Sequence, residues 1–199
     1  SRVALTGALL QKEINVIASV ATAKDALEAQ NKFQPNIAIC DLDLGLGPNG
    51  IDIAVALRKV NPNIGIILLT SYRDPRLANS NHQPIPSGTI LLNKNELQSI
   101  SILLMQIADA LENPTKKRHG EWSKSGNFQA LSDTQIEILV AVAQGATTND
   151  IAASRGVSVQ AIEKSIKAIC KKLDIPTNSD RNQRVQLVRS YFYGVGKEV

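Results

Sequence analysis

Three polar residues in the first half of the chain each end an apolar run, and together they suit phosphoryl chemistry. Asp41 follows Ile-Ala-Ile-Cys, Thr70 follows Ile-Ile-Leu-Leu, and Lys94 follows Ile-Leu-Leu-Asn. A carboxylate accepts a phosphoryl group, a hydroxyl hydrogen-bonds to it, and an ammonium neutralises its charge. Each of these residue types alone is common at the end of a strand, so it is their combination that favours a phosphate-handling site.

A parallel sheet is what must bring these three residues together. Apolar, β-branched runs predict strands over 15–20, 36–41, 64–70 and 89–92. Helical patterns lie between and after them, over 21–33, 51–60 and 96–111. Strands this apolar, separated by helices, predict an α/β domain whose parallel sheet is covered on both faces and carries its polar chemistry at the carboxyl ends. The Pro-, Asn- and Ser-rich stretch 71–86 predicts an irregular loop.

The second half of the chain has a different pattern. Residues 113–130 lack periodicity and predict a linker, which includes the basic triplet 116–118. Beyond it, Ser132 and Gln135 form a capping box before an apolar helix that Gly145 ends. Three further helices are predicted over 149–155, 159–173 and 180–192, the first capped by Thr148, with a turn at Gly156 and a cap at Ser158. A short helix, a glycine turn and a longer helix are typical of a helix-turn-helix.

The charge of the chain is divided in the same way. Up to Thr115, nine Lys and Arg stand against ten Asp and Glu, a net charge of −1; the remainder has thirteen against eight, a net charge of +5. On the predicted helix 159–173, one narrow sector opposite the isoleucines holds Gln160, Lys164, Lys167 and Lys171. A lysine face is often only solvated, but on the second helix of a helix-turn-helix it suits the major groove of DNA.

The first half resembles a response-regulator receiver domain, a flavodoxin-like fold. The resemblance lies in Ile37–Asp41 with its Gly-rich loop, Leu68–Thr70 and Leu91–Lys94. It implies that a sensor histidine kinase phosphorylates Asp41, that Thr70 and Lys94 respond to the phosphate, and that Mg²⁺ binds at Asp41 and Asp43. Residues 2–10 resemble the helix that follows the family's first strand. Two features depart from the family: Leu91 stands where an aromatic residue is usual, and no acidic pair precedes residues 2–10.

The family's first strand, which is the central one of its sheet, also has no counterpart in the sequence. Without it the strands at 15–20 and 36–41 would lose hydrogen-bond partners. An N-terminal strand outside the given sequence, a strand from another chain and a rearranged sheet would each resolve this. We expect the first, and sequencing the N-terminus of the native gene product tests it.

The second half resembles the LuxR/NarL-type DNA-binding domain. The matching residues run from Leu131-Ser132 and Glu137-Ile138-Leu139 through Asp150-Ile151-Ala152 to Ala161-Ile162 and Lys172-Leu173. The resemblance implies that Glu163, Lys164 and Lys167 touch DNA and that the helix at 180–192 mediates dimer contacts. Glu163 departs from the basic residue usual there, so the family's sequence preference is not carried over.

Taken together, the sequence predicts a transcriptional regulator with a receiver-like domain at 1–112, a linker at 113–130 and a helix-turn-helix domain at 131–199. The expected partners are double-stranded DNA, a histidine kinase and a second copy of the chain. Cys40 is predicted to be a core residue; it and Cys170 are far apart, which predicts reduced thiols and a cytoplasmic location. No apolar run approaches the roughly 20 residues of a membrane span. The sequence also shows no nucleophile–base pair of the kind that an enzyme would use, so no enzyme is predicted.

Two alternatives to this interpretation stay open. The first is a regulator that works without phosphorylation, whose receiver-like domain only dimerises or senses a ligand; Leu91 and the lack of an acidic pair favour it. The second is an adaptor whose helical domain binds a protein instead of DNA, and Glu163 is the residue that favours it.

Overall fold

The chain forms two compact units. The computed structural model describes residues 2–44, 47–78, 84–97, 99–116, 127–176 and 182–196. One unit is built from residues 1–70 and 81–122, and the other from residues 71–80 and 123–199. The segment 71–80 therefore belongs structurally with the second half of the chain, although it lies within the first half in sequence.

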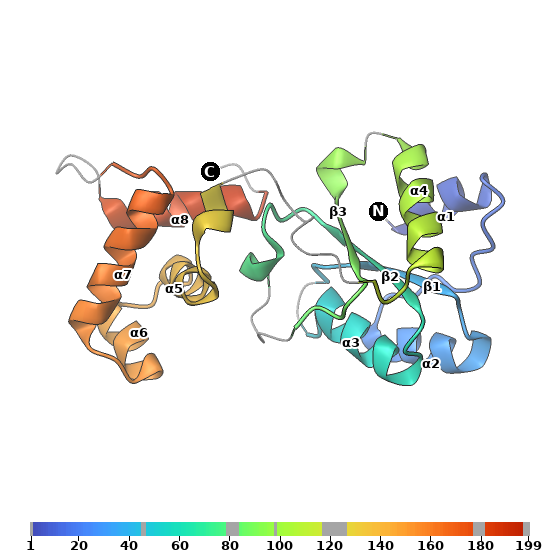
Figure 1. Cartoon of the computed structure of the whole chain (residues 1–199), viewed down its shortest axis with the longest axis horizontal. Coiled ribbons are helices and arrows are strands. Elements are labelled where there is room, and N and C mark those ends of the chain that lie inside the picture. Colours follow the sequence, from blue (N-terminus) through green and yellow to red (C-terminus); the bar gives the residue numbers. More distant parts are fainter. Residues whose placement is uncertain are drawn as a thin grey trace. The chain divides into compact units, whose positions relative to one another are not determined.

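The first unit is a parallel sheet between helices (Figure 1). Its three strands, β1 (Ile37–Asp41), β2 (Gly65–Thr70) and β3 (Ile90–Asn93), stand in the order β1-β2-β3. Helices α1 (Arg2–Leu10) and α4 (Ile100–Glu112) share one apolar cluster with β2 and β3. Helices α2 (Ala23–Phe33) and α3 (Gly50–Val60) contact each other, and α3 packs on β1 and β2. These elements confirm the predicted α/β architecture.

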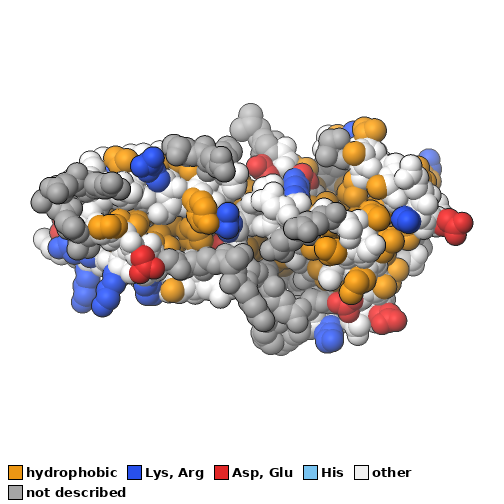
Figure 2. Space-filling view, turned by 90° about the horizontal axis from the view of Figure 1, so that it is seen from above, with side chains coloured by type: hydrophobic (Ala, Val, Ile, Leu, Met, Phe, Trp, Pro, Cys, Tyr) orange, Lys and Arg blue, Asp and Glu red, His pale blue; other side chains and the backbone are white. Residues whose placement is uncertain are grey.

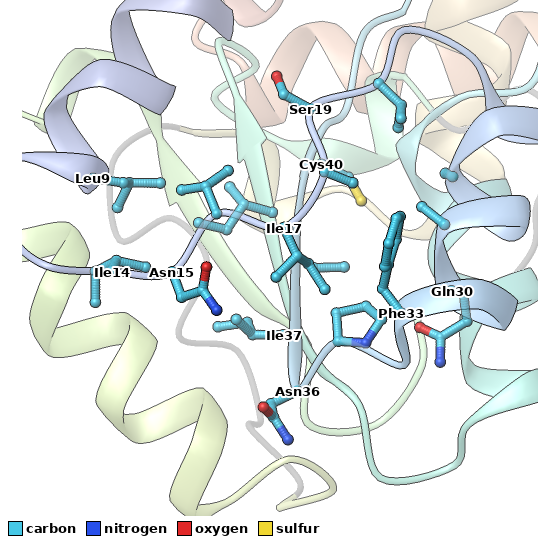
Figure 3. Close-up of a pocket in the computed structure, with 18 of the residues that line it drawn as sticks. Leu9, Ile14, Asn15, Ile17, Ser19, Gln30, Phe33, Asn36, Ile37 and Cys40 are labelled. Carbon is cyan, nitrogen blue, oxygen red and sulfur yellow. The ribbon is translucent and has the colours of Figure 1, made fainter.

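The predicted strand at 15–20 is wrong: these residues form no strand in the structure. A strand is held by hydrogen bonds to a neighbouring strand, and among the described residues no strand pairs with this segment. A cavity of about 570 Å³ lies instead between residues 14–20 and β1. Figure 3 shows Ile14 and Ile17 across from Ile37 and Cys40 around it. An apolar, β-branched segment does not form a strand when no neighbouring strand is available to share its backbone hydrogen bonds.

The second unit is a bundle of short helices. They are α5 (Asp133–Ala143), α6 (Thr148–Arg155), α7 (Val159–Lys172) and α8 (Gln183–Gly194), preceded by a 3₁₀ turn at Asn127–Ala130. Their core contains side chains that the helical spacing predicted to be buried, including Ile136, Leu139, Ile162 and Ile169. Asp180, the predicted start of the last helix, and residues 117–126 of the predicted linker lie outside the described residues.

The caps of these helices follow the sequence closely, with one correction. Ser132 and Gln135 form the predicted capping box, and the Ser158 hydroxyl accepts a hydrogen bond from the Ala161 amide. The cap of α6 is Thr147, not Thr148: its hydroxyl accepts from the Asp150 amide, and the Asp150 carboxylate accepts from the Thr147 amide. The reason is that Asp150 stands three residues after Thr147, which is the spacing that a capping box requires.

In the stretch 71–86, the described residues contain a single 3₁₀ turn, Pro75–Leu77, and no longer helix. Residues 79–83 lie outside the described part. Residues 71–78 nevertheless have well-defined contacts within the second unit.

Candidate functional site

The carboxyl edge of the sheet brings Asp41 and Lys94 into direct contact. Asp41 is the last residue of β1, and Lys94 follows the last residue of β3. The ammonium of Lys94 lies 2.5 Å from Oδ2 of Asp41, and both side chains are a little over one-third exposed at 36% and 37%. A carboxylate that is reachable from solvent and neutralised by an ammonium has the character expected of a phosphoryl acceptor.

Thr70 ends the strand that lies between these two. β2 pairs with β1 through Asp41 opposite Leu69, and with β3 through Thr70 opposite Asn93. Thr70 therefore stands one residue beyond the level of Asp41 and one residue before the level of Lys94. It is 4% exposed. The sheet thus places all three predicted residues at the carboxyl ends of its strands.

Leu42, the residue after Asp41, is hydrogen-bonded both to β2 and to the start of α3. The Leu42 amide donates to the Leu69 carbonyl, and the Gly50 amide donates to the Leu42 carbonyl. A Cβ at Gly50 would lie 2.4 Å from the Asp41 carbonyl oxygen, so only glycine allows α3 to begin this close to the site. Asn49 caps α3 there. Sequence reasoning did not single out Gly50, because its role depends on a close approach that only the fold reveals.

The carboxylate of Asp41 has a second partner in its own loop. The backbone amide of Asp43 donates to Asp41 Oδ1 at 3.1 Å, which fixes the orientation of the carboxyl group while Oδ2 faces Lys94. Within the described ranges, no group of three or more His, Cys, Asp or Glu side chains comes together as a metal site would require. Mg²⁺ usually takes one or two carboxylates together with waters and phosphate oxygens, so Asp41 and Asp43 are carboxylates of the kind that it needs.

Cys40 lies beside this site but differs from the prediction that it is a core residue. It is half-buried and lines the cavity next to β1. Burial of the thiol, and secondly the negative charge of Asp41, raise the pKa of Cys40 to about 12. A thiol with so high a pKa is a poor nucleophile at neutral pH.

The second candidate site is the outer face of α7. Gln160, Glu163, Lys164, Lys167 and Lys171 are all exposed, whereas Ile162 and Ile169 on the opposite side are buried. Figure 2 shows Lys and Arg side chains gathered along one edge of this unit. The face therefore combines three lysines with an amide and one carboxylate, which suits contacts to phosphates and to base edges.

The lysine next to this face has a different environment. Lys172 donates a hydrogen bond to the side chain of Gln135 on α5 at 2.8 Å. The glycine turn before α7 is formed as predicted, with Gly156 at a φ of +63°. The ion pair between Arg155 and Glu137 joins α6 to α5. These contacts hold α7 in place and leave its outer face open. Among the described residues, no helix is long and apolar enough to cross a membrane.

Comparisons with protein families agree with this division of the chain. A model described as a response regulator receiver domain matches residues 2–85, and a model of bacterial regulatory proteins of the luxR family matches residues 129–189. The two matches contain the candidate residues Asp41 and Thr70 on one side and the α7 face on the other.

Similar proteins align with this chain over most of their length. The response regulator protein VraR of Staphylococcus saprophyticus is 23% identical over 182 residues, covering 88% of this chain and 84% of that protein. The oxygen regulatory protein NreC of Staphylococcus haemolyticus is 25% identical, covering 85% and 84%. A solved structure of RcsB from Salmonella enterica serovar Typhimurium, bound to promoter rprA, has a TM-score of 0.53 at 20% identity, covering 98% of this chain and 93% of that one.

Proposed function

This chain belongs to the response regulators that join a receiver domain to a LuxR-family domain, and on that premise we propose that it is a transcription regulator whose DNA binding is controlled by phosphorylation of Asp41. The observation that carries the proposal is the contact between Lys94 Nζ and Asp41 Oδ2 at the carboxyl edge of the sheet. Phosphorylation would place extra negative charge where an ammonium already stands, which favours the phosphorylated state.

Thr70 is the residue that we propose as the sensor of the phosphate, together with Lys94. Its hydroxyl belongs to the strand between the other two residues and is buried at the same edge. A hydroxyl there can donate to a phosphoryl oxygen, and a change in its orientation would move the backbone that follows β2. Such a change shifts an equilibrium that exists already, and does not create a new state.

Receiver domains generally use Mg²⁺ for phosphorylation, and we propose that cofactor here as well. Asp41 and Asp43 are the carboxylates of the described part from which it would be held, and the ion would help to neutralise the incoming phosphoryl group. Mg²⁺ in proteins usually takes one or two carboxylates and completes its shell with waters and phosphate oxygens, and the proposed control itself is carried by Asp41, Thr70 and Lys94. Phosphorylation with and without Mg²⁺ measures the contribution of the ion.

For the output, we propose that the α7 face enters the major groove of double-stranded DNA. Lys164, Lys167 and Lys171 would contact phosphates, and Gln160 and Glu163 would reach base edges. The solved RcsB structure described above is bound to a promoter, which supports this assignment. A second copy of the chain, a histidine kinase as phosphoryl donor and a cytoplasmic location complete the proposal. Along the sequence we propose domain boundaries at 1–112, 113–130 and 131–199, apart from residues 71–80, which belong with the second unit.

Intact mass spectrometry after incubation with acetyl phosphate and Mg²⁺ tests the input. The wild-type chain is expected to gain one phosphoryl group, Asp41→Asn to gain none, and Asp25→Asn, which removes an acid in α2, to behave like the wild type. A mobility-shift assay on DNA fragments of random sequence tests the output, where salt-sensitive binding is expected.

A second candidate function is a regulator that works without phosphorylation. The observation in its favour is that Asp41 and Asp43 lack a third acidic neighbour among the described residues. It predicts salt-sensitive DNA binding with no phosphoryl adduct on the wild-type chain. The same two experiments therefore separate the two functions.

A further inference from the structure

The segment that follows Thr70 is built into the helical unit. We call residues 71–78 the strap. Asp74 within it is fully buried, and its carboxylate accepts hydrogen bonds from the amide, Nε and Nη2 of Arg76, the last at 2.7 Å. A buried carboxylate requires such partners, because an unpaired charge in the interior is strongly destabilising. The strap is thus a defined structure and more than a connection.

Arg76 connects this buried carboxylate to the beginning of α5. Its Nη1 donates to the Leu131 carbonyl and to Asp133 Oδ1, and its Nη2 donates to the Phe128 carbonyl, all at 2.9–3.0 Å. The planar guanidinium has five N–H groups, and its contacts to Asp74 and to these three residues use its whole fork. The residues just before α5 and the first residue of that helix are therefore held by the strap.

The strap also holds the end of α8. The amide of Arg73 donates to the Gly194 carbonyl at 2.7 Å, and its guanidinium lies 4.0 Å from the centre of the Tyr193 ring. Leu77 is 3% exposed and belongs to the core of the helical unit. A Cβ at Gly194 would lie 2.5 Å from Leu77 Cδ1, so the strap and α8 are packed without spare room. One short segment therefore restrains two helices that are far apart in sequence.

We propose that the strap transmits the state of the Asp41 site to the DNA-binding unit, with Arg76 and Arg73 as its positioning residues. This inference rests on the proposed function, because Thr70 is the assigned phosphate sensor and Ser71 is the next residue. A displacement of Thr70 passes along three peptide bonds to Arg73, which contacts the end of α8. Three peptide bonds further it reaches Arg76, which contacts the start of α5. Because the strap is packed into the helical unit, its displacement changes the positions of the helices that it contacts.

The test compares DNA affinity with and without acetyl phosphate and Mg²⁺ in the full chain. Phosphorylation is expected to change the affinity of the wild type by about fivefold or more, a usual size for coupling between sites. Arg73→Ala and Arg76→Ala should each take up the phosphoryl group yet change affinity less than about twofold, because the coupling free energy is lost. Arg155→Ala removes an arginine that contacts α5 from within the unit, and it should respond like the wild type.

Hydrogen exchange separates transmission from simple loss of folding. Arg76→Ala leaves the buried carboxylate of Asp74 without its guanidinium partner and removes the contacts to Leu131, Asp133 and Phe128, so we expect the amides at the start of α5 to exchange about tenfold faster or more. Arg73→Ala is the milder variant and keeps the Asp74–Arg76 pair, so it should lose the phosphate response while α5 stays protected. A full response to phosphate in Arg73→Ala and in a folded Arg76→Ala would overturn the proposal.

The failure of the proposed function looks different. A wild-type chain that gains no phosphoryl mass refutes phosphorylation at Asp41 and, with it, transmission of that signal. A wild-type chain that gains the mass and responds, with strap variants that respond equally, refutes the strap alone. A wild-type chain that gains the phosphoryl mass without any change in its DNA affinity would also count against transmission. This holds even if the α5 amides exchange faster in Arg76→Ala.

Discussion

Lys94 Nζ lies 2.5 Å from Asp41 Oδ2, although the two residues are 53 positions apart; Asp41 ends β1 and Lys94 follows β3, and these strands are not neighbours in the sheet. The contact spans the end of β2, where Thr70 stands. Removing Lys94 therefore shows whether this ion pair stabilises the fold or serves phosphorylation, because the two roles affect different measured quantities.

Lys94→Ala is expected to change the free energy of unfolding by less than about 1 kcal/mol, because both partners are partly exposed and such pairs contribute little. The same variant should lose the effect of acetyl phosphate on DNA affinity. Urea unfolding and a binding titration measure the two quantities. Lys24→Ala, which removes an exposed ion pair with Glu28 on α2, is the matched control and should keep the phosphate effect.

Lys164→Ala and Lys167→Ala should each weaken DNA binding and reduce the slope of log affinity against log salt by up to about one. The reason is that each lysine is expected to displace about one counterion from DNA. Binding titrations between low and moderate salt provide the slopes. Lys172→Ala is the control on the same helix, since its ammonium is bonded to Gln135. If both slopes stay at the wild-type value, these lysines do not contact DNA.

Gly50→Ala is expected to destabilise the first unit by about 1–3 kcal/mol, because the new methyl group would overlap the Asp41 carbonyl. Gly7→Ala provides the opposite control. It lies in α1 with nothing within 4 Å of the added carbon, and alanine should stabilise that helix by about 0.5–1 kcal/mol. Thermal unfolding compares the two. Equal effects from both changes would contradict the close approach at Gly50.

Thr147→Ala should destabilise the helical unit by about 1 kcal/mol through loss of the N-cap of α6, whereas Thr148→Ala should stay within about 0.5 kcal/mol of the wild type. The hydrogen bond from the Thr147 hydroxyl lowers the pKa of Asp150. A lowered carboxyl pKa stabilises the fold above the ordinary value of about 4 and loses this effect as the pH falls through the folded-state pKa. The difference between wild type and Thr147→Ala should therefore shrink in acid.

Both thiols should resist a disulfide reagent such as DTNB at pH 8 in the folded chain and react at once in denaturant. Cys170 is fully buried, and burial raises its pKa; the pKa of Cys40 is raised to about 12. Both shifts reduce the thiolate that attacks the reagent. The variant Cys170→Ser isolates Cys40. Rapid labelling of Cys40 in the folded chain would show that its thiol is open to solvent.

Much of this arrangement could be predicted, because the relevant forces act over short stretches of sequence. Ile162 and Ile169 are buried as the helical period requires, and Asp41 and Lys94 meet because parallel strands share their carboxyl edge. The predicted strand at 15–20 is wrong because a ladder depends on a neighbour as well as on composition. The cap of α6 was misplaced by one residue where two threonines adjoin, and the Asp150 spacing decides between them.

The role of the strap could not be predicted in the same way. Asp74 and Arg76 lie in a stretch whose prolines and asparagines indicate only a loop. Their burial depends on carbonyl groups more than fifty residues further along the chain, at Phe128 and Leu131. No pattern within the strap predicts such a contact, because the types and spacing of its residues would be the same whether or not a distant part of the chain packed against it.

The strap also bears on how such regulators exchange parts. In a chimera that joins this chain to the helical part of a relative within residues 113–130, the strap would come from this chain and the helices from the relative. Leu77 and Arg76 would then contact helices with which they do not normally pack. Recombination that preserves folding would have to carry residues 71–78 together with the helices from α5 to α8, as two separate inserts. The helical unit is therefore discontinuous in the sequence, and compensating changes between relatives should be sought between the strap and the end of α8.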